Sequence, residues 1–127
     1  MGCVSLSGAS VLIVEDDDIL ARVEDWRLKN LGYMVSGRVA TGAEAMEVVV
    51  NNRPDVVLMD INIRGTMDGI ETAQMIKKGY DIPVIYMSSH PDTVTVERAK
   101  ATKPEGFIVK PFHDADLRVA IELALKK

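Results

Sequence analysis

Three short apolar runs in this chain of 127 residues, VLIV, VVLM and FIV, each end in side chains that could do chemistry. The polar residues that follow them are Glu15 and Asp16, then Asp60, and then Lys110. If the runs are strands of one parallel sheet, their carboxyl ends lie along one edge, which is where open α/β folds place their ligand chemistry. The sequence therefore predicts a site that combines three carboxylates with one ammonium group.

Such a site is suited to the transfer of a phosphoryl group onto a carboxylate. A carboxylate nucleophile would meet a phosphoryl group of like charge, so cations must lie where negative charge builds up. Carboxylates are ligands for a hard divalent ion such as Mg²⁺, which keeps some of its water and takes few protein ligands. Lys110 supplies a compact ammonium group that can pair first with Asp60 and afterwards with a phosphoryl oxygen.

The elements that would position these residues alternate from one end of the chain to the other. Apolar runs predict five strands, at residues 11–14, 33–39, 55–59, 84–87 and 107–109. Helical periodicity predicts five helices, at residues 19–31, 42–51, 70–78, 93–100 and 114–125. Right-handed crossovers on both faces then give a doubly wound parallel sheet of the α/β class, in which the more polar second strand is an edge.

Local signals predict several helix ends. Thr41 and Glu44 have the spacing of a capping box at the start of the second helix. Gly32 and Gly79 are expected to end the first and third helices, because glycine readily adopts the left-handed conformation that follows a helix. Asp114 or its neighbour is expected to cap the last helix.

Length and composition indicate one globular domain. A chain of 127 residues can bury a single core, and we expect residues 1–8 to be a flexible leader and residues 9–127 to form the domain. The net charge of -4 argues against direct binding to nucleic acid.

The sequence also predicts a cytoplasmic protein without membrane attachment. No apolar stretch approaches the roughly 18 residues that a membrane span needs, and no secretory signal is present. Cys3 has no other cysteine with which to form an internal disulfide. Leu6 stands where an N-myristoylation motif needs serine or threonine.

Five motifs occur in an order and at a spacing that resemble the receiver domain of two-component response regulators. They are VED at residues 14–16, LMD at 58–60, MDG at 67–69, PVIYMS at 83–88 and VKPF at 109–112. The resemblance covers about residues 9–126, which is nearly the whole chain. It implies a flavodoxin-like fold with the strand order 2-1-3-4-5.

The resemblance also implies roles for the polar residues. Asp16 and Asp60 would bind Mg²⁺, or Mn²⁺, directly; Glu15 would bind it through water, and the backbone carbonyl of Asn62 would supply a further oxygen. Asp60 would take a phosphoryl group from a phosphohistidine on a histidine kinase or a phosphotransfer protein. The family's Lys-Pro bond is cis, a geometry that would aim Lys110 inward.

Two further residues are implied to carry the response. Ser88 would donate a hydrogen bond to the phosphoryl group, with Ser89 as the second choice. Phe107 stands where the family has an aromatic switch that swings inward, although taken without the family it is simply a core aromatic. The surface of the fourth helix, fifth strand and fifth helix would then change shape, bind an unknown output protein and could also form a dimer.

The loop after Asp60 departs from the family pattern. Between Asp60 and Asp68 it is one residue longer than the commonest family loop, and it has Arg64 where that loop usually has proline. Its geometry beside the metal, and its contact with a partner, therefore need not follow the family's.

The run of three aspartates at residues 16–18 leaves a choice of register. The acid pair could be Asp16 and Asp17. Strand length favours Glu15 and Asp16, because the pair should follow the last apolar residue of the strand directly. Asp17 or Asp18 then serves as the helix N-cap.

Several other residues have a plainer interpretation. Trp26 is expected to be a partly buried packing residue, and Tyr86 a core residue of the fourth strand. His90 and His113 lack partners at metal-ligand spacing, so a zinc site is not expected. His90 is close to Ser88 in the sequence and could modulate the access of water at the rim of the site.

Two rival functions remain open. A phosphatase of the haloacid-dehalogenase type also forms an aspartyl phosphate, but its nucleophile follows the first strand and has a second aspartate two residues later. Here Asp60 follows the third predicted strand, and the residue two positions on is Asn62. A degenerate receiver that binds partners without phosphorylation is disfavoured, because the acids, the serine and the lysine are all retained. The preferred interpretation is a signalling module more than an enzyme.

Overall fold

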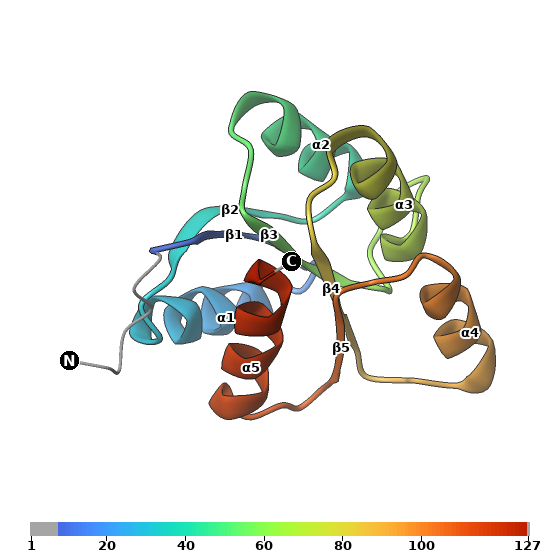
Figure 1. The fold of residues 1–127 in the computed structure, drawn as a ribbon. Helices are drawn as coiled ribbons and strands as arrows, with labels where there is room; N and C mark the ends of the chain where they lie inside the picture. The colour runs from blue at the N-terminus through green and yellow to red at the C-terminus, as the bar shows by residue number, and fades with distance from the viewer. Residues whose placement is uncertain (1–7, 127) are drawn as a thin grey trace.

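The computed structural model describes residues 8–126 as a five-stranded parallel sheet with five helices (Figure 1). The strands are β1 (Ser10–Val14), β2 (Met34–Val39), β3 (Val56–Asp60), β4 (Val84–Ser88) and β5 (Gly106–Val109). The helices are α1 (Asp18–Asn30), α2 (Gly42–Asn51), α3 (Gly69–Tyr80), α4 (Thr93–Ala101) and α5 (Asp114–Leu125). The order across the sheet is β2-β1-β3-β4-β5, so the predicted flavodoxin-like α/β topology is confirmed.

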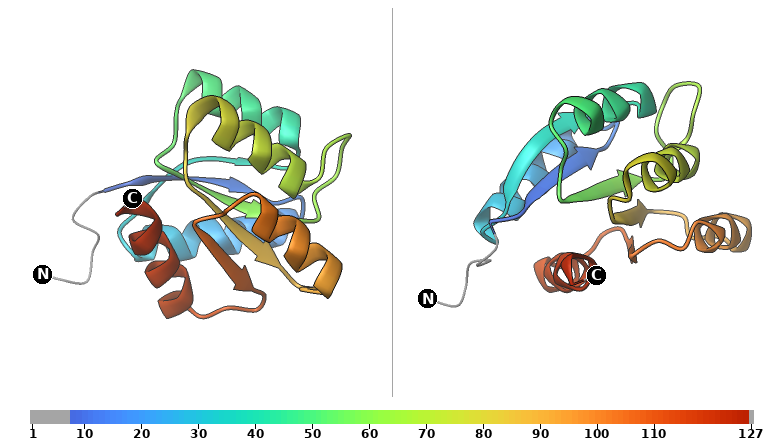
Figure 2. Two further views of the ribbon diagram at one scale, coloured as in Figure 1. Left: turned by 45° about the vertical axis from the view of Figure 1, so that its right-hand side comes forward. Right: turned by 45° about the horizontal axis from the view of Figure 1, so that its top comes forward.

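The helices cover both faces of the sheet. α1 and α5 pack against one face, and α2, α3 and α4 lie over the other, with apolar clusters on each side of the sheet. Figure 2 shows these layers in two further views. Every residue of β3 and β4 is buried, which explains why these strands are continuous apolar runs in the sequence. β2 is the predicted edge strand, and none of its residues is fully buried.

One predicted helix end is wrong. Gly32 follows α1 with a φ of 96°, and the predicted capping box at the start of α2 is present. Gly79, however, does not end α3, because the helix continues to Tyr80 and Asp81 takes the left-handed conformation with a φ of 52°. Aspartate is one of the few residues besides glycine that visit this conformation, so Asp81 supplies the C-cap that was assigned to glycine.

The predictions for three individual residues have different outcomes. His113, the neighbour of Asp114, occupies the cap position of α5. Tyr86 is fully buried in β4, as expected. Trp26 was expected to be partly buried, but it is 66% exposed because α1 turns a different stripe of residues toward the sheet. None of the described helices combines the length and the apolar character that a bilayer crossing requires.

α4 buries less of itself than the other helices do. Ala99 alone is buried among its nine residues. Arg98 Nη2 donates to Asp68 Oδ2 at 2.8 Å, at the residue that caps α3. The hydroxyl of Tyr86 lies 2.8 Å from Oγ1 of Thr102, the residue at the C-terminal cap of α4. These polar contacts attach α4 to the β3–α3 loop and to β4.

Candidate functional site

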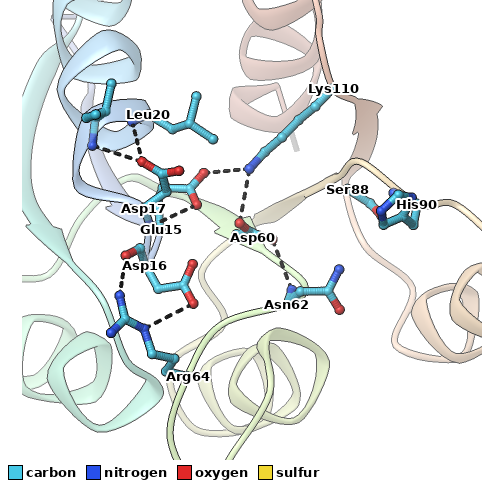
Figure 3. Close-up of polar contacts among 11 residues, drawn as sticks. Glu15, Asp16, Asp17, Leu20, Asp60, Asn62, Arg64, Ser88, His90 and Lys110 are labelled. Carbon is cyan, nitrogen blue, oxygen red and sulfur yellow. Dashed lines mark hydrogen bonds and ion pairs between the residues drawn. The ribbon is translucent and has the colours of Figure 1, made fainter.

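The carboxyl ends of β1, β3 and β5 bring the acids and the lysine together at one edge of the sheet (Figure 3). Glu15, Asp16 and Asp60 each offer a carboxylate oxygen, and these oxygens lie within 4.8 Å of one another. Glu15 is 3% exposed and Asp60 is 6% exposed, whereas Asp16 lies nearer the surface. Acids at this separation repel one another unless a cation compensates them.

Lys110 is a cation placed directly against this cluster. Its Nζ donates to Glu15 Oε1 at 2.6 Å and to Asp60 Oδ2 at 3.0 Å. Burial alone would lower the pKa of Lys110, but the hydrogen bonds to the two carboxylates outweigh that effect and raise it. The bond between Lys110 and Pro111 is cis. Pairing with Asp60 follows the prediction, whereas the shorter contact with Glu15 was not predicted.

The chain around Asp60 is held by close backbone contacts. A Cβ on Gly69, the first residue of α3, would lie 2.1 Å from the carbonyl oxygen of Asp60, so only glycine fits there. The N–H of Gly69 donates to the carbonyl of Ile61 at 2.9 Å. Asp60 Oδ1 accepts from the N–H of Asn62, also at 2.9 Å. The glycine of the MDG motif thus lets α3 begin directly against the end of β3.

Asp17 is the N-cap of α1 and does not belong to the acid cluster. Its Oδ1 accepts from the backbone N–H of Ile19 at 3.0 Å and from that of Leu20 at 3.1 Å. A side chain used in this way satisfies donors at the start of the helix that have no other partner in it. The structure therefore fits the register that pairs Glu15 with Asp16.

Ser88 is the last residue of β4, at this edge, whereas Phe107 lies two residues before the end of β5. Ser88 is fully buried, and its Oγ accepts from the backbone N–H of His90 at 3.1 Å. Accepting this bond leaves the hydroxyl hydrogen for another acceptor. Ser89, the second choice for this role, is exposed. Phe107 is half-buried and packs edge-on against Tyr86, with the ring centroids 6.3 Å apart.

Glu24 is a buried acid near the cluster that sequence reasoning missed. It is 4% exposed, and its Oε1 has no hydrogen-bond partner among the described residues. Burial, followed by the neighbouring Glu15, raises the pKa of Glu24 to about 9, so this acid is protonated at neutral pH. Burial and the nearby Asp60 also raise the pKa of Glu15, although Lys110 opposes that rise.

A signal for Glu24 was present in the sequence. The residues that α1 buries are Ala21, Glu24 and Leu28, at the spacing of one helix face. An acid within an otherwise apolar stripe is buried with the rest of the stripe, so it must either have a buried partner or have a raised pKa.

Glu24→Gln should change how the stability of the protein depends on pH. Because the pKa of Glu24 rises from 4.5 to about 9 on folding, the folded protein binds the extra proton between these values. The stability that this group contributes is complete below about pH 4.5 and is lost as the pH rises to about 9. The glutamine variant lacks this loss, so its free energy of unfolding should exceed the parent's by more than about 1 kcal/mol near pH 9.

Urea unfolding without Mg²⁺, at a series of pH values from 5 to about 9, measures this difference. Glu47→Gln is the matched control, because Glu47 is an exposed residue of α2 and its variant should follow the parent at every pH. Parallel stability profiles for the parent and Glu24→Gln would contradict the prediction.

Arg64 also contacts the acid cluster, from the β3–α3 loop. Its Nη2 donates to the backbone carbonyl of Asp16 at 2.8 Å, and its Nε lies 3.5 Å from Asp16 Oδ2. The Arg64 side chain is 77% exposed. In Figure 3 the acids lie between Lys110 and Arg64. The sequence marked Arg64 only as a departure from the family loop and did not predict this contact.

Comparison with known proteins assigns the chain to a family. The model of the response regulator receiver domain matches residues 11–122. The transcriptional regulatory protein PdtaR of Mycobacterium tuberculosis is 33% identical over 117 residues, which make up 92% of this chain and 57% of that protein. The transcriptional regulatory protein CseB of Streptomyces avermitilis is 30% identical over 117 residues, which make up 49% of its length. The chain thus spans about half the length of these curated relatives.

Solved structures agree with this assignment. The signal receiver domain of a modulated diguanylate cyclase from Desulfovibrio desulfuricans is 38% identical, with a TM-score of 0.88 over 93% of this chain and 94% of that chain. The N-terminal domain of a response regulator/sensory box/GGDEF three-domain protein from Carboxydothermus hydrogenoformans is 32% identical, with a TM-score of 0.83 over 92% of this chain and 94% of that one. The chain therefore belongs to the response regulator receiver domain family.

Proposed function

We propose that this chain is a phosphoacceptor switch of a two-component signalling system. Asp60 takes a phosphoryl group from a phosphohistidine on a histidine kinase or phosphotransfer protein, and the altered domain then engages an output protein. The observation that carries the proposal is the position of Asp60, a nearly buried carboxylate that pairs with Lys110 inside a cluster of three acids. A carboxylate in this setting has both a counter-charge and a place for a metal ion.

The donor set fits a hard divalent cation. Three carboxylates whose oxygens lie within 4.8 Å of one another are the ligands that Mg²⁺ or Mn²⁺ prefers. Asp16 and Asp60 would hold the ion directly, Glu15 through water, and Asn62 through its backbone carbonyl. When bound, the ion supplies positive charge against the oxygens of the phosphoryl group.

The transfer requires only one covalent step from the protein, the attack of a carboxylate oxygen on phosphorus. An oxygen of Asp60 attacks phosphorus, the bond between phosphorus and the histidine nitrogen breaks, and its electron pair returns to the imidazole, which takes up a proton. Lys110 moves from Asp60 Oδ2 to a phosphoryl oxygen as the carboxylate becomes an acyl phosphate. The product is an aspartyl phosphate with up to about two negative charges.

The response would run through β4 and β5. Ser88 would donate its hydroxyl hydrogen to the phosphoryl group, and Phe107 would follow by turning inward. These shifts would alter the surface of α4, β5 and α5, where an output protein or a second copy of the chain would bind. Such a domain is a signalling module more than an enzyme.

Incubation with acetyl phosphate and Mg²⁺ tests the proposal. One phosphoryl group should be added per chain, labile to base and to hydroxylamine, and chelation of Mg²⁺ should prevent its addition. If the protein neither binds Mg²⁺ nor takes up label, it is a degenerate receiver. Steady turnover of p-nitrophenyl phosphate would instead favour the phosphatase, although Asp60 lies at the end of the third strand and not of the first, and Asn62 stands where that family needs an aspartate.

A further inference from the structure

Arg64 and Lys110 contact the acid cluster from different sides (Figure 3). We infer that Arg64 is a second functional cation of this site. Its guanidinium pairs with the carboxylate of Asp16 until the divalent ion binds, and then contacts the incoming phosphoryl group. The inference deepens the proposed function and rests on it. It gives a role to the loop that departs from the family pattern.

The contact with Asp16 places Arg64 in competition with the metal ion. The guanidinium Nε lies 3.5 Å from Oδ2 of Asp16, and this carboxylate is also one of the three that would hold the ion. One carboxylate oxygen cannot serve both cations at full strength, and two positive charges side by side repel each other. Binding of Mg²⁺ should therefore displace the guanidinium from Oδ2 and should be weaker than in a protein without Arg64.

The loop keeps the displaced arginine beside the site. A second bond, from Nη2 to the backbone carbonyl of Asp16 at 2.8 Å, does not involve the carboxylate and can persist. The loop backbone is also anchored, because Arg64 forms an isolated parallel bridge with Thr41, at the start of α2. Gly65 follows with a φ of 110°, a conformation that a residue with a side chain rarely adopts.

A guanidinium displaced from the Asp16 carboxylate suits a phosphoryl group, because its Nε and its remaining N–H donors are then available. Arginine presents several N–H donors in a planar fork that matches phosphate oxygens. The side chain is 77% exposed, so it can reorient without breaking core packing. Lys110 is 14% exposed and already holds Glu15 and Asp60. Arg64 is thus the cation that a phosphodonor approaching from solvent would meet first.

Arg64→Met should raise the affinity for Mg²⁺ and lower the rate of labelling by acetyl phosphate. Mg²⁺ should bind about two- to fivefold more tightly without any phosphodonor, because an exposed ion pair of modest strength no longer competes for Asp16. With Mg²⁺ saturating, labelling by acetyl phosphate at low ionic strength should be at least about threefold slower, because a cation that attracts the donor is lost. Amide NMR titration of Asn62 and its neighbours measures the first effect, and timed labelling measures the second.

Two variants control the experiment. Arg22→Met removes the same charge from another exposed ion pair, with Asp18 at 3.2 Å, and should change neither measurement. Arg64→Lys keeps the charge without the fork, so its Mg²⁺ affinity and labelling rate should both fall between those of the parent and of Arg64→Met.

The results separate this inference from the proposed function. If the parent protein binds Mg²⁺ and is labelled, but Arg64→Met binds the ion equally or more weakly, Arg64 does not compete for Asp16 and the inference is overturned. An unchanged labelling rate at saturating Mg²⁺ would overturn the contact with the phosphoryl group. A parent protein that neither binds Mg²⁺ nor takes up label would instead remove the proposed function itself.

Discussion

Asp60→Asn should reduce labelling by acetyl phosphate and Mg²⁺ to the background level. The amide has nearly the shape of the carboxylate but lacks the charge that attacks phosphorus. The folded state should survive, because the amide oxygen can still accept one of the two hydrogen bonds that the two carboxylate oxygens accept, from the N–H of Asn62 at 2.9 Å and from Lys110 at 3.0 Å. The loss of one negative charge also reduces the repulsion among the acids. Mass spectrometry of the intact chain before and after hydroxylamine treatment measures the result.

Asp18→Asn is the control for the loss of one acid from this region. Asp18 belongs to the same acidic run, but its side chain is 76% exposed and it pairs with Arg22 outside the cluster. This variant should be labelled like the parent. Undiminished, hydroxylamine-sensitive labelling of Asp60→Asn would place the nucleophile on another residue.

Lys110→Ala should abolish the conformational response to beryllofluoride even in molecules where Asp60 still carries the ligand. Its ammonium is the charge that joins Glu15 and Asp60, at 2.6 Å and 3.0 Å. After phosphorylation that charge should draw β5 toward the phosphoryl group, and alanine cannot replace it. Hydrogen exchange of residues 86–100 and 107–126, with and without beryllofluoride, reports the response.

Ser88→Ala is the matched comparison, because Ser88 should touch the same phosphoryl group through one neutral hydrogen bond worth about 0.5 to 1.5 kcal/mol. This variant should be phosphorylated nearly normally and should respond weakly in both segments. A full response of Lys110→Ala would show that the lysine does not couple the site to the surface. A full response of Ser88→Ala would make Ser89 the candidate hydroxyl.

Much of the architecture could be predicted because the buried strands of a parallel sheet give a clear pattern of apolar residues in the sequence. Strands buried on both faces must be apolar throughout, so VLIV and VVLM stand out, and residues after such strands share one edge. The convergence of Asp60 with Lys110, which are 50 positions apart, follows from that rule alone. The helix end at Asp81 was missed because Gly79 carries the stronger statistical signal, although the choice depends on local contacts.

The unpredicted features of the site depend on side-chain direction in three dimensions. Arg64 lies in a loop without periodicity, so the sequence could not indicate that its guanidinium contacts Asp16. The prediction of Glu24 would have required the assumption that an ionisable side chain is buried, which is uncommon for glutamate. Trp26 was misjudged for the converse reason, because a large aromatic residue is usually packed, and this one is 66% exposed.

The slight burial of α4 has a consequence for how this domain could diversify. A helix that buries only Ala99 contributes little to global stability, so most substitutions on its outer positions should leave the fold and the acid cluster intact. New partner specificities could therefore accumulate on α4 without a matching change at Asp60. The contacts of α4 with Asp68 and Tyr86 would be the exceptions, because substitutions there would weaken the attachment of the helix to the β3–α3 loop and to β4.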